Sequence, residues 1–232
     1  MTRRSAETIG AASVVATVTE LGYSIISSDA FLVACNKTSG LLSVPGIGPE
    51  KADCLVARLQ TEFPGVRIVH RLDRDTSGVI VLARDAATHR ALSIAFQDRM
   101  VTKTYEALVA GHVELDAGEV NLPLRKEELG SARQMVHMTE GKPSLTLYEV
   151  ISRGTSADGF EYSRVCLTPK TGRSHQLRVH MLAIGHPILG DDLYAAGAVL
   201  RARARLCLHA SSISFVHPST RAQMLFESAA EF

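Results

Sequence analysis

The chain has 232 residues, which is long enough for one sizeable hydrophobic core or two closely packed lobes. Its ordinary share of hydrophobic residues excludes a disordered or fibrous protein. The net charge of +1 is not that of a strongly basic nucleic-acid-binding domain, so any such function must depend on local positive patches.

The N-terminal half of the chain shows alternating strand and helix patterns. Residues 1–22 have weak periodicity and are expected to form an N-terminal extension, mobile or partly helical, before one folded domain over residues 23–232. A short apolar run predicts a strand over 31–35, and Pro49 opens a predicted helix that ends near Gln60. A buried strand is predicted over 79–83, followed by a helix over 86–97 with one apolar face.

The C-terminal half is richer in predicted strands. A strand is expected over 101–110, whereas the charged, Gly- and Pro-containing stretch 115–142 cannot be assigned from its pattern. Strands are predicted over 144–152 and 160–167, and a helix over 173–184 that ends at a glycine.

The last predicted elements are a short helix after Asp191 and strands over 206–208 and 213–216. Several neighbouring strands have no helix between them. The order therefore favours an α+β fold with a mixed, largely antiparallel sheet over a doubly wound parallel one.

The cysteines of the chain are far apart and form no Cys-x-x-Cys pair, which argues against a structural zinc site. Most of them lie in apolar, strand-like runs, as expected for reduced thiols in the cytoplasm. No apolar stretch approaches the length of a membrane span, so no membrane association is expected.

The segment from His70 to Gly78, HRLDRDTSG, is the most informative part of the chain. Asp73 lies between arginines in a turn that leads into an apolar strand, next to a glycine that lets another backbone approach. A carboxylate in such surroundings is a candidate nucleophile. On spacing alone, the favoured interpretation is that Asp73 or Asp75 caps the turn and pairs with Arg71 or Arg74.

Several other segments occur in a recognisable order with this one. They are Lys103-Thr104-Tyr105-Glu106-Ala107, PKTGRSHQLRVH over 169–180, GHPILGD over 185–191 with Tyr194 after it, LCLHA over 206–210 and FVHP over 215–218. Together with HRLDRDTSG they resemble the RluA family of RNA pseudouridine synthases over about residues 30–232. The resemblance implies a mixed sheet with flanking helices around a central RNA-binding cleft.

The reaction that the resemblance implies is the isomerisation of uridine to pseudouridine within RNA. Asp73 would be the nucleophile and Arg178 the guanidinium that favours its charged form. Tyr105 would stack on the base, with its hydroxyl near the carbon that must lose a proton. Helical spacing from His175 to Leu182 suggests that Arg178 projects from a helix anchored by apolar neighbours.

Residues for RNA contact are also implied. Arg71 would fill the space vacated by the extruded base, and Leu177 would pack against that base or belong to the core. Lys103 and Arg173 are candidate phosphate contacts.

The implied chemistry requires no redox cofactor, nucleotide or metal, and no motif for one is found. His175, His180 and His186 lack the carboxylate or thiolate neighbours of a metal site.

The expected partner is RNA, a tRNA anticodon stem-loop or large-subunit rRNA, bound by a monomer. Two alternatives remain: a non-catalytic RNA-binding module on the same scaffold, and a metal-dependent nuclease that uses Asp73 and Asp75.

Overall fold

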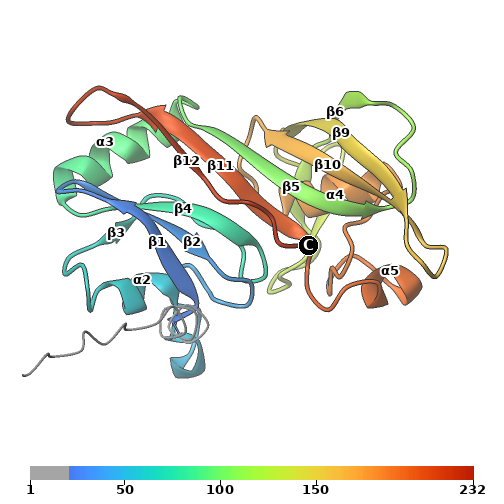
Figure 1. Cartoon of the computed structure of the whole chain (residues 1–232), viewed down its shortest axis with the longest axis horizontal. Helices are drawn as coiled ribbons and strands as arrows, with labels where there is room; N and C mark the ends of the chain where they lie inside the picture. The colour runs from blue at the N-terminus through green and yellow to red at the C-terminus, as the bar shows by residue number, and fades with distance from the viewer. Residues whose placement is uncertain (1–20) are drawn as a thin grey trace, which may run out of the picture.

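A single ten-stranded sheet runs through residues 21–232, the part of the chain that this computed structural model describes (Figure 1). Its strands are β1 (Tyr23–Ser28), β2 (Leu32–Lys37), β3 (Arg67–Ile68), β4 (Ser77–Ala83), β5 (Thr102–Ala110), β6 (Ala117–Asn121), β9 (Leu145–Thr155), β10 (Glu161–Pro169), β11 (Leu208–Val216) and β12 (Gln223–Glu227). The order is β1-β2-β4-β11-β5-β10-β9-β6, with β3 beside β4 and β12 beside β11. Only the β4–β11 pair is parallel, which confirms the predicted mixed, largely antiparallel α+β arrangement.

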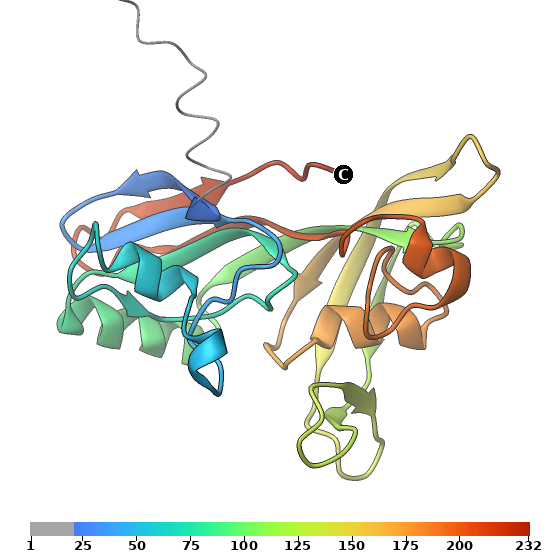
Figure 2. The same cartoon turned by 90° about the horizontal axis from the view of Figure 1, so that it is seen from below.

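The remaining elements of the described residues are a small hairpin of β7 (Leu124–Lys126) and β8 (Gln134–Val136), and five helical segments, of which the first is a short turn of 3-10 helix. These are η1 (Pro49–Lys51), α2 (Leu55–Leu59), α3 (Ala86–Gln97), α4 (Gln176–Ala183) and α5 (Gly197–Arg201). Figure 1 shows the long strands β5 and β11 joining a lobe with β1 to β4 to a lobe with β6, β9 and β10. In the turned view of Figure 2 the β7–β8 hairpin, in yellow-green, projects away from the sheet.

Strand β4 forms the centre of the first lobe and is buried along its whole length. Ile80 and Leu82 pack into a cluster with α2, whereas Val79 and Val81 pack into a second cluster with α3. Because both faces of the strand are covered, its sequence is a continuous apolar run rather than an alternating one. In the second lobe, Leu177 and Met181 of α4 pack on β5 and β10.

Two predicted helices are shorter than their sequence patterns suggest. The helix predicted from Pro49 is divided because Cys54 is extended (φ −161°) and inserts a fully buried side chain into the core; α2 begins only at Leu55. The helix predicted from Arg173 begins at Gln176, since His175 takes a left-handed φ of 53° that a helix does not accommodate.

The strands predicted over 206–208 and 213–216 are one strand, β11. Ser211 and Ser212 in its middle have a polar pattern typical of a break, but their hydroxyls bond to Thr104 of β5 at 3.1 and 2.6 Å. The edge strands β1 and β12 were not predicted, and β6, β7 and β8 lie in the stretch without an assignment. Predictions for residues 1–20 lie outside the described residues, and no described helix is long and apolar enough to cross a bilayer.

Candidate active site

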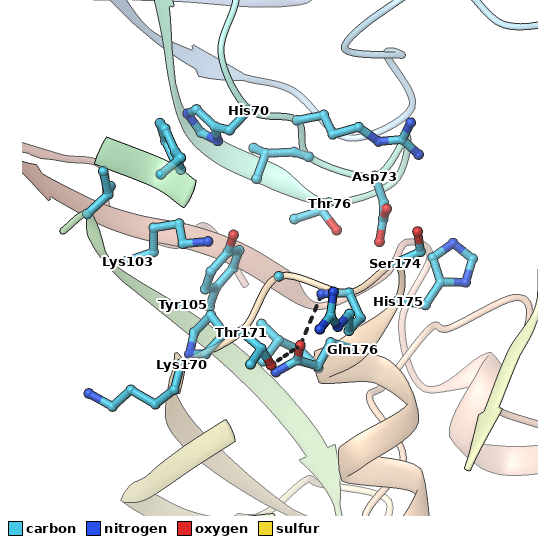
Figure 3. Close-up of a pocket in the computed structure, with 18 of the residues that line it drawn as sticks. His70, Asp73, Thr76, Lys103, Tyr105, Lys170, Thr171, Ser174, His175 and Gln176 are labelled. Atoms are coloured by element: carbon cyan, nitrogen blue, oxygen red, sulfur yellow. Dashed lines mark hydrogen bonds between the residues drawn. The ribbon is translucent and has the colours of Figure 1, made fainter. Parts of the chain in front are cut away.

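A cleft of about 640 Å³ lies where the segment before β4, the α3–β5 turn, β5 and the loop before α4 meet (Figure 3). The structure brings all of the residues that the sequence assigns to the site into its lining. They are Asp73, Tyr105, Arg178, Arg71, Lys103, Arg173 and Leu177. Segments about a hundred residues apart therefore converge on one cavity.

Asp73 is half-buried and is the only carboxylate among the residues that line the cleft. Within residues 21–232 no hydrogen bond or ion pair engages its side chain. Its neighbour Asp75 instead pairs with Arg74 at 3.0 Å and does not line the cleft. Pairing of Asp73 with Arg74 is therefore ruled out, and the two carboxylates do not converge as a metal-dependent nuclease would require.

The backbone on both sides of Asp73 is held by buried side chains. The Ser43 hydroxyl donates to the Leu72 carbonyl at 2.7 Å and accepts from the Leu72 N–H at 3.1 Å. The Lys37 ammonium donates to the carbonyls of Arg74, Leu41 and Thr38 at 2.8–2.9 Å. Burial lowers the pKa of Lys37 to about 7, although the charges of Asp75 and Asp73 oppose this shift. Sequence reasoning missed Lys37 and Ser43 because nothing local links them to the turn.

Arg178 is only 2% exposed, and its side chain projects from α4 into a buried ion pair at the wall of the cleft. Its Nε and Nη2 bond to the two carboxylate oxygens of Asp191 at 2.7 and 2.5 Å, and Nη2 also bonds to Asp192 at 3.1 Å. Burial disfavours its charge, but the bonds to Asp191 and the charges of Asp191 and Asp73 keep the pKa of Arg178 above its ordinary value. Arg178 therefore contributes positive charge to the cleft without an ion pair to Asp73.

Tyr105 lies on β5 at the junction of the two lobes and packs against the cores of both. Burial and the Asp73 charge raise the pKa of Tyr105, so the hydroxyl stays protonated at neutral pH. Next to it, the Lys103 ammonium lies over the Phe96 ring at 5.8 Å, and burial lowers its pKa.

His70, the first residue of the HRLD segment, stacks on Phe96 with ring centroids 4.7 Å apart. Its Nε2 accepts a hydrogen bond from the Val81 N–H, while burial and the Lys103 charge lower the pKa of His70 to about 3. His70 is thus a neutral acceptor that fastens the segment to β4.

The loop before α4 forms the opposite wall of the cleft. Gln176 fixes it, because its amide oxygen accepts from the Thr171 hydroxyl at 2.7 Å and from the Arg173 N–H at 3.1 Å (Figure 3). His175 Nδ1 bonds to the Tyr194 hydroxyl at 2.8 Å, and that hydroxyl accepts from the Gln134 N–H of β8 at 2.7 Å. The resemblance includes Tyr194 but gives it no role.

The exposed surface of the cleft is positive. Arg71 and Arg173, both exposed, lie at it together with Lys170, and so does Arg99, which the sequence did not single out. Leu177 is 6% exposed and belongs to both the core and the cleft. Cations around a single carboxylate suit a polyanionic substrate.

The histidines considered for a metal site do not meet. His180 bonds to Thr146 and to the Leu122 carbonyl, and His186 bonds to the Ala110 carbonyl. No group of three or more His, Cys, Asp or Glu side chains arranged to hold a metal occurs in the described part of the chain.

Comparisons with known proteins agree with this geometry. Residues 31–183 match the family described as RNA pseudouridylate synthase. The chain is 48% identical over 196 residues to the dual-specificity RNA pseudouridine synthase RluA of Vibrio parahaemolyticus, covering 84% of this chain and 78% of that protein. It is 45% identical over 208 residues to the protein of the same name from Escherichia coli, covering 90% and 93%.

A solved structure, human RNA Pseudouridylate Synthase Domain Containing 1, superposes with a TM-score of 0.77 at 31% identity, covering 91% of this chain and 85% of that one. Human RNA Pseudouridylate Synthase Domain Containing 4, at 24% identity and a TM-score of 0.71, shares the fold over 94% and 91% of the two chains. From the family match and the identity over most of its length, this chain belongs to the RNA pseudouridylate synthases, isomerases that act on RNA.

Proposed function

We propose that this protein converts uridine to pseudouridine in structured RNA with Asp73 as the nucleophile. The observation that carries the proposal is an unpaired carboxylate in a cleft that also contains Tyr105, Arg178 and exposed cations. In the reaction the bond from ribose C1′ to uracil N1 breaks and a bond from C1′ to C5 forms. The proton lost from C5 is balanced by the proton gained at N1, so the atoms of substrate and product are the same.

A uridine inside folded RNA must leave the stack to reach Asp73, at a cost of a few kcal/mol. Arg71 is exposed at the cleft, and its planar guanidinium can stack where the base was. Tyr105 then stacks on the extruded base. Its aromatic ring, which lines the cleft, supplies the stacking surface.

As substrates we propose a uridine in a tRNA anticodon stem-loop, a uridine in a loop of large-subunit rRNA, or both. The relatives named dual-specificity support two targets. On the basis of these substrates we propose that the enzyme works in the cytoplasm. We further propose a monomer as the active form, because the proposed mechanism assigns no role to a residue of a second copy of the chain.

The direct test is Asp73→Asn, which removes the charge and keeps the shape. We expect pseudouridine, mapped chemically in tRNA and rRNA, to be lost while RNA affinity stays within about threefold. The matched control is Asp75→Asn, which removes a neighbouring carboxylate outside the cleft and should retain activity.

Full activity of Asp73→Asn would remove Asp73 from the mechanism. If the wild-type protein binds RNA but releases no C5 proton from labelled uridine, the protein is a non-catalytic RNA-binding module instead.

A further inference from the structure

The Thr76 hydroxyl is a buried polar group without a partner. Thr76 is 2% exposed and lines the cleft, yet its Oγ1 makes no hydrogen bond. Among the described residues the only other buried side-chain polar atom without a hydrogen bond is Arg125 Nε, which faces the Glu140 carboxylate at 3.6 Å. Buried polar groups in native proteins are nearly always hydrogen-bonded, so an exception at a cleft indicates a partner that arrives with the substrate.

The backbone around Thr76 leaves its side chain little freedom. The next two residues, Ser77 and Gly78, pair with His209 and Ala210 of β11. A Cβ on Gly78 would lie 2.3 Å from the Ala210 carbonyl oxygen, which shows how closely the two strands approach. A β-branched side chain on such a fixed backbone has few rotamers. Figure 3 shows Thr76 on the same wall of the cleft as Asp73, with the loop that carries Thr171 and Ser174 opposite.

The surroundings of Thr76 favour a neutral ligand group over a phosphate. The exposed residues Arg71, Lys170 and Arg173 can serve the phosphates, whereas the deep part of the cleft is lined by Leu72, Leu177 and Leu208, all buried. Burying a charged phosphate there would cost far more desolvation free energy than burying an uncharged pyrimidine.

We propose that the Thr76 hydroxyl donates a hydrogen bond to a carbonyl oxygen of the extruded uracil and so orients the base while it is isomerised. This inference rests on the proposed function. Uracil carries O2 and O4 on either side of N3. A half turn about the N3–C6 axis exchanges O2 with O4 as it exchanges N1 with C5. A donor that faces one carbonyl position therefore finds an acceptor both before and after the turn.

The proposal predicts opposite effects of one substitution on stability and on activity. Thr76→Val removes a hydroxyl that has no partner in the free protein, so the free energy of unfolding should stay the same or rise. In the complex the same change leaves a buried uracil carbonyl unsatisfied. We expect kcat to fall about 10- to 100-fold, with little change in KM because the contact forms after extrusion.

Two further variants complete the experiment. Thr76→Ser keeps the hydroxyl and should restore kcat to within about threefold of wild type. Thr88→Val is the matched control: Thr88 is also buried, but it lies away from the cleft and its hydroxyl donates to Asp85 at 2.7 Å. This control should lower the free energy of unfolding and leave kcat unchanged.

Each other result overturns the inference. If Thr76→Val keeps the wild-type kcat, the hydroxyl does not contact the uracil during the reaction. If Thr76→Val loses as much stability as Thr88→Val, the hydroxyl has a structural role instead. A change confined to RNA affinity and its salt dependence places the contact on the RNA backbone instead. The proposed function fails separately, if wild-type protein forms no pseudouridine in any RNA.

Discussion

Arg178 and Asp191 bury opposite charges against each other beside the cleft, with side chains 2% and 0% exposed. Taking both charges out of water is costly, so such a pair is sustained by its geometry, here two parallel hydrogen bonds. Asp191 also accepts hydrogen bonds from the backbone N–H groups of Leu193 and Tyr194, both at 3.0 Å, and so fixes the loop after α4 to the guanidinium. Asp191 thus both positions Arg178 and supplies the negative charge that keeps the guanidinium protonated.

Replacing Asp191 with Asn should therefore destabilise the protein more than an ordinary charge loss. It leaves the Arg178 guanidinium buried and only partly paired, at a cost of about 3 kcal/mol in the free energy of unfolding. Urea unfolding measures this loss. Asp192→Asn is the control, since Asp192 is 51% exposed and its pair with Arg178 should contribute less than about 1 kcal/mol. Equal effects of the two variants would contradict this explanation of the buried pair.

At the scale of elements, the parallel contact between β4 and β11 sets the position of the Asp73 turn. Gly78 is confirmed as the point of close backbone approach that its place in the sequence indicated, and its φ of +114° is one that other residues rarely adopt. Ser77 adds a hydrogen bond from its hydroxyl to His209 at 2.9 Å. The first lobe and the strand that leads into the second are thereby joined next to the site.

Gly78→Ala should be strongly destabilising for two separable reasons. Positive φ costs an alanine about 1–3 kcal/mol, and the new Cβ would also overlap the Ala210 backbone. Gly65→Ala isolates the first cost, because Gly65 has a φ of +83° but nothing within 4 Å of the Cβ position. We expect Gly78→Ala to lower the free energy of unfolding by at least about 2 kcal/mol more than Gly65→Ala. If both variants lose a similar free energy of unfolding, β11 can shift away from the new Cβ at little cost.

At the scale of the whole molecule, the two lobes are joined by shared strands rather than by ion pairs across the cleft. Arg74 and Asp192 face each other at 3.6 Å, but both are more than half exposed and contribute little. Strands β5 and β11, in contrast, run between the lobes (Figure 1). The cleft is consequently a fixed feature of the sheet, and the projecting β7–β8 hairpin reaches it through Tyr194.

Tyr194 connects that hairpin to the cleft. The guanidinium carbons of Arg133 and Arg178 lie 5.5 and 5.1 Å from the centroid of its ring. Its hydroxyl is hydrogen-bonded both to the Gln134 N–H of β8 and to His175. Tyr194→Phe keeps the ring contacts and removes both hydrogen bonds. The free energy of unfolding should fall by about 1–3 kcal/mol, and pseudouridine formation in structured RNA should slow because His175 and the hairpin are no longer fixed together.

Tyr162→Phe is the control for this change, because the Tyr162 hydroxyl makes no hydrogen bond to any described residue. It should leave both quantities unchanged. Wild-type stability and turnover in Tyr194→Phe would show that the hairpin and the cleft are independent.

The HRLD turn and the helix over 86–97 show which features can be predicted from local sequence patterns. Apolar spacing predicted the helix over 86–97, and the structure has it at those bounds with Asp85 as its N-cap. All seven residues that the motifs assigned to the site line the cleft. The boundaries near Cys54 and His175 were not predictable, because burial of one side chain and a left-handed backbone there override local propensity. The short edge strands β1 and β12 contain apolar residues without strict alternation, and most of their side chains are exposed.

By itself the sequence determined the type of fold, the family and the residues of the cleft, since these follow from the order of motifs and from patterns within single elements. Only the tertiary structure decided which polar atoms have hydrogen-bond partners. Lys37, Asp191 and Tyr194 hold the site from distant positions, and Thr76 is left without a partner. Hydrogen-bond satisfaction and burial depend on which chain segments meet, and sequence spacing does not encode distances between segments that are a hundred residues apart.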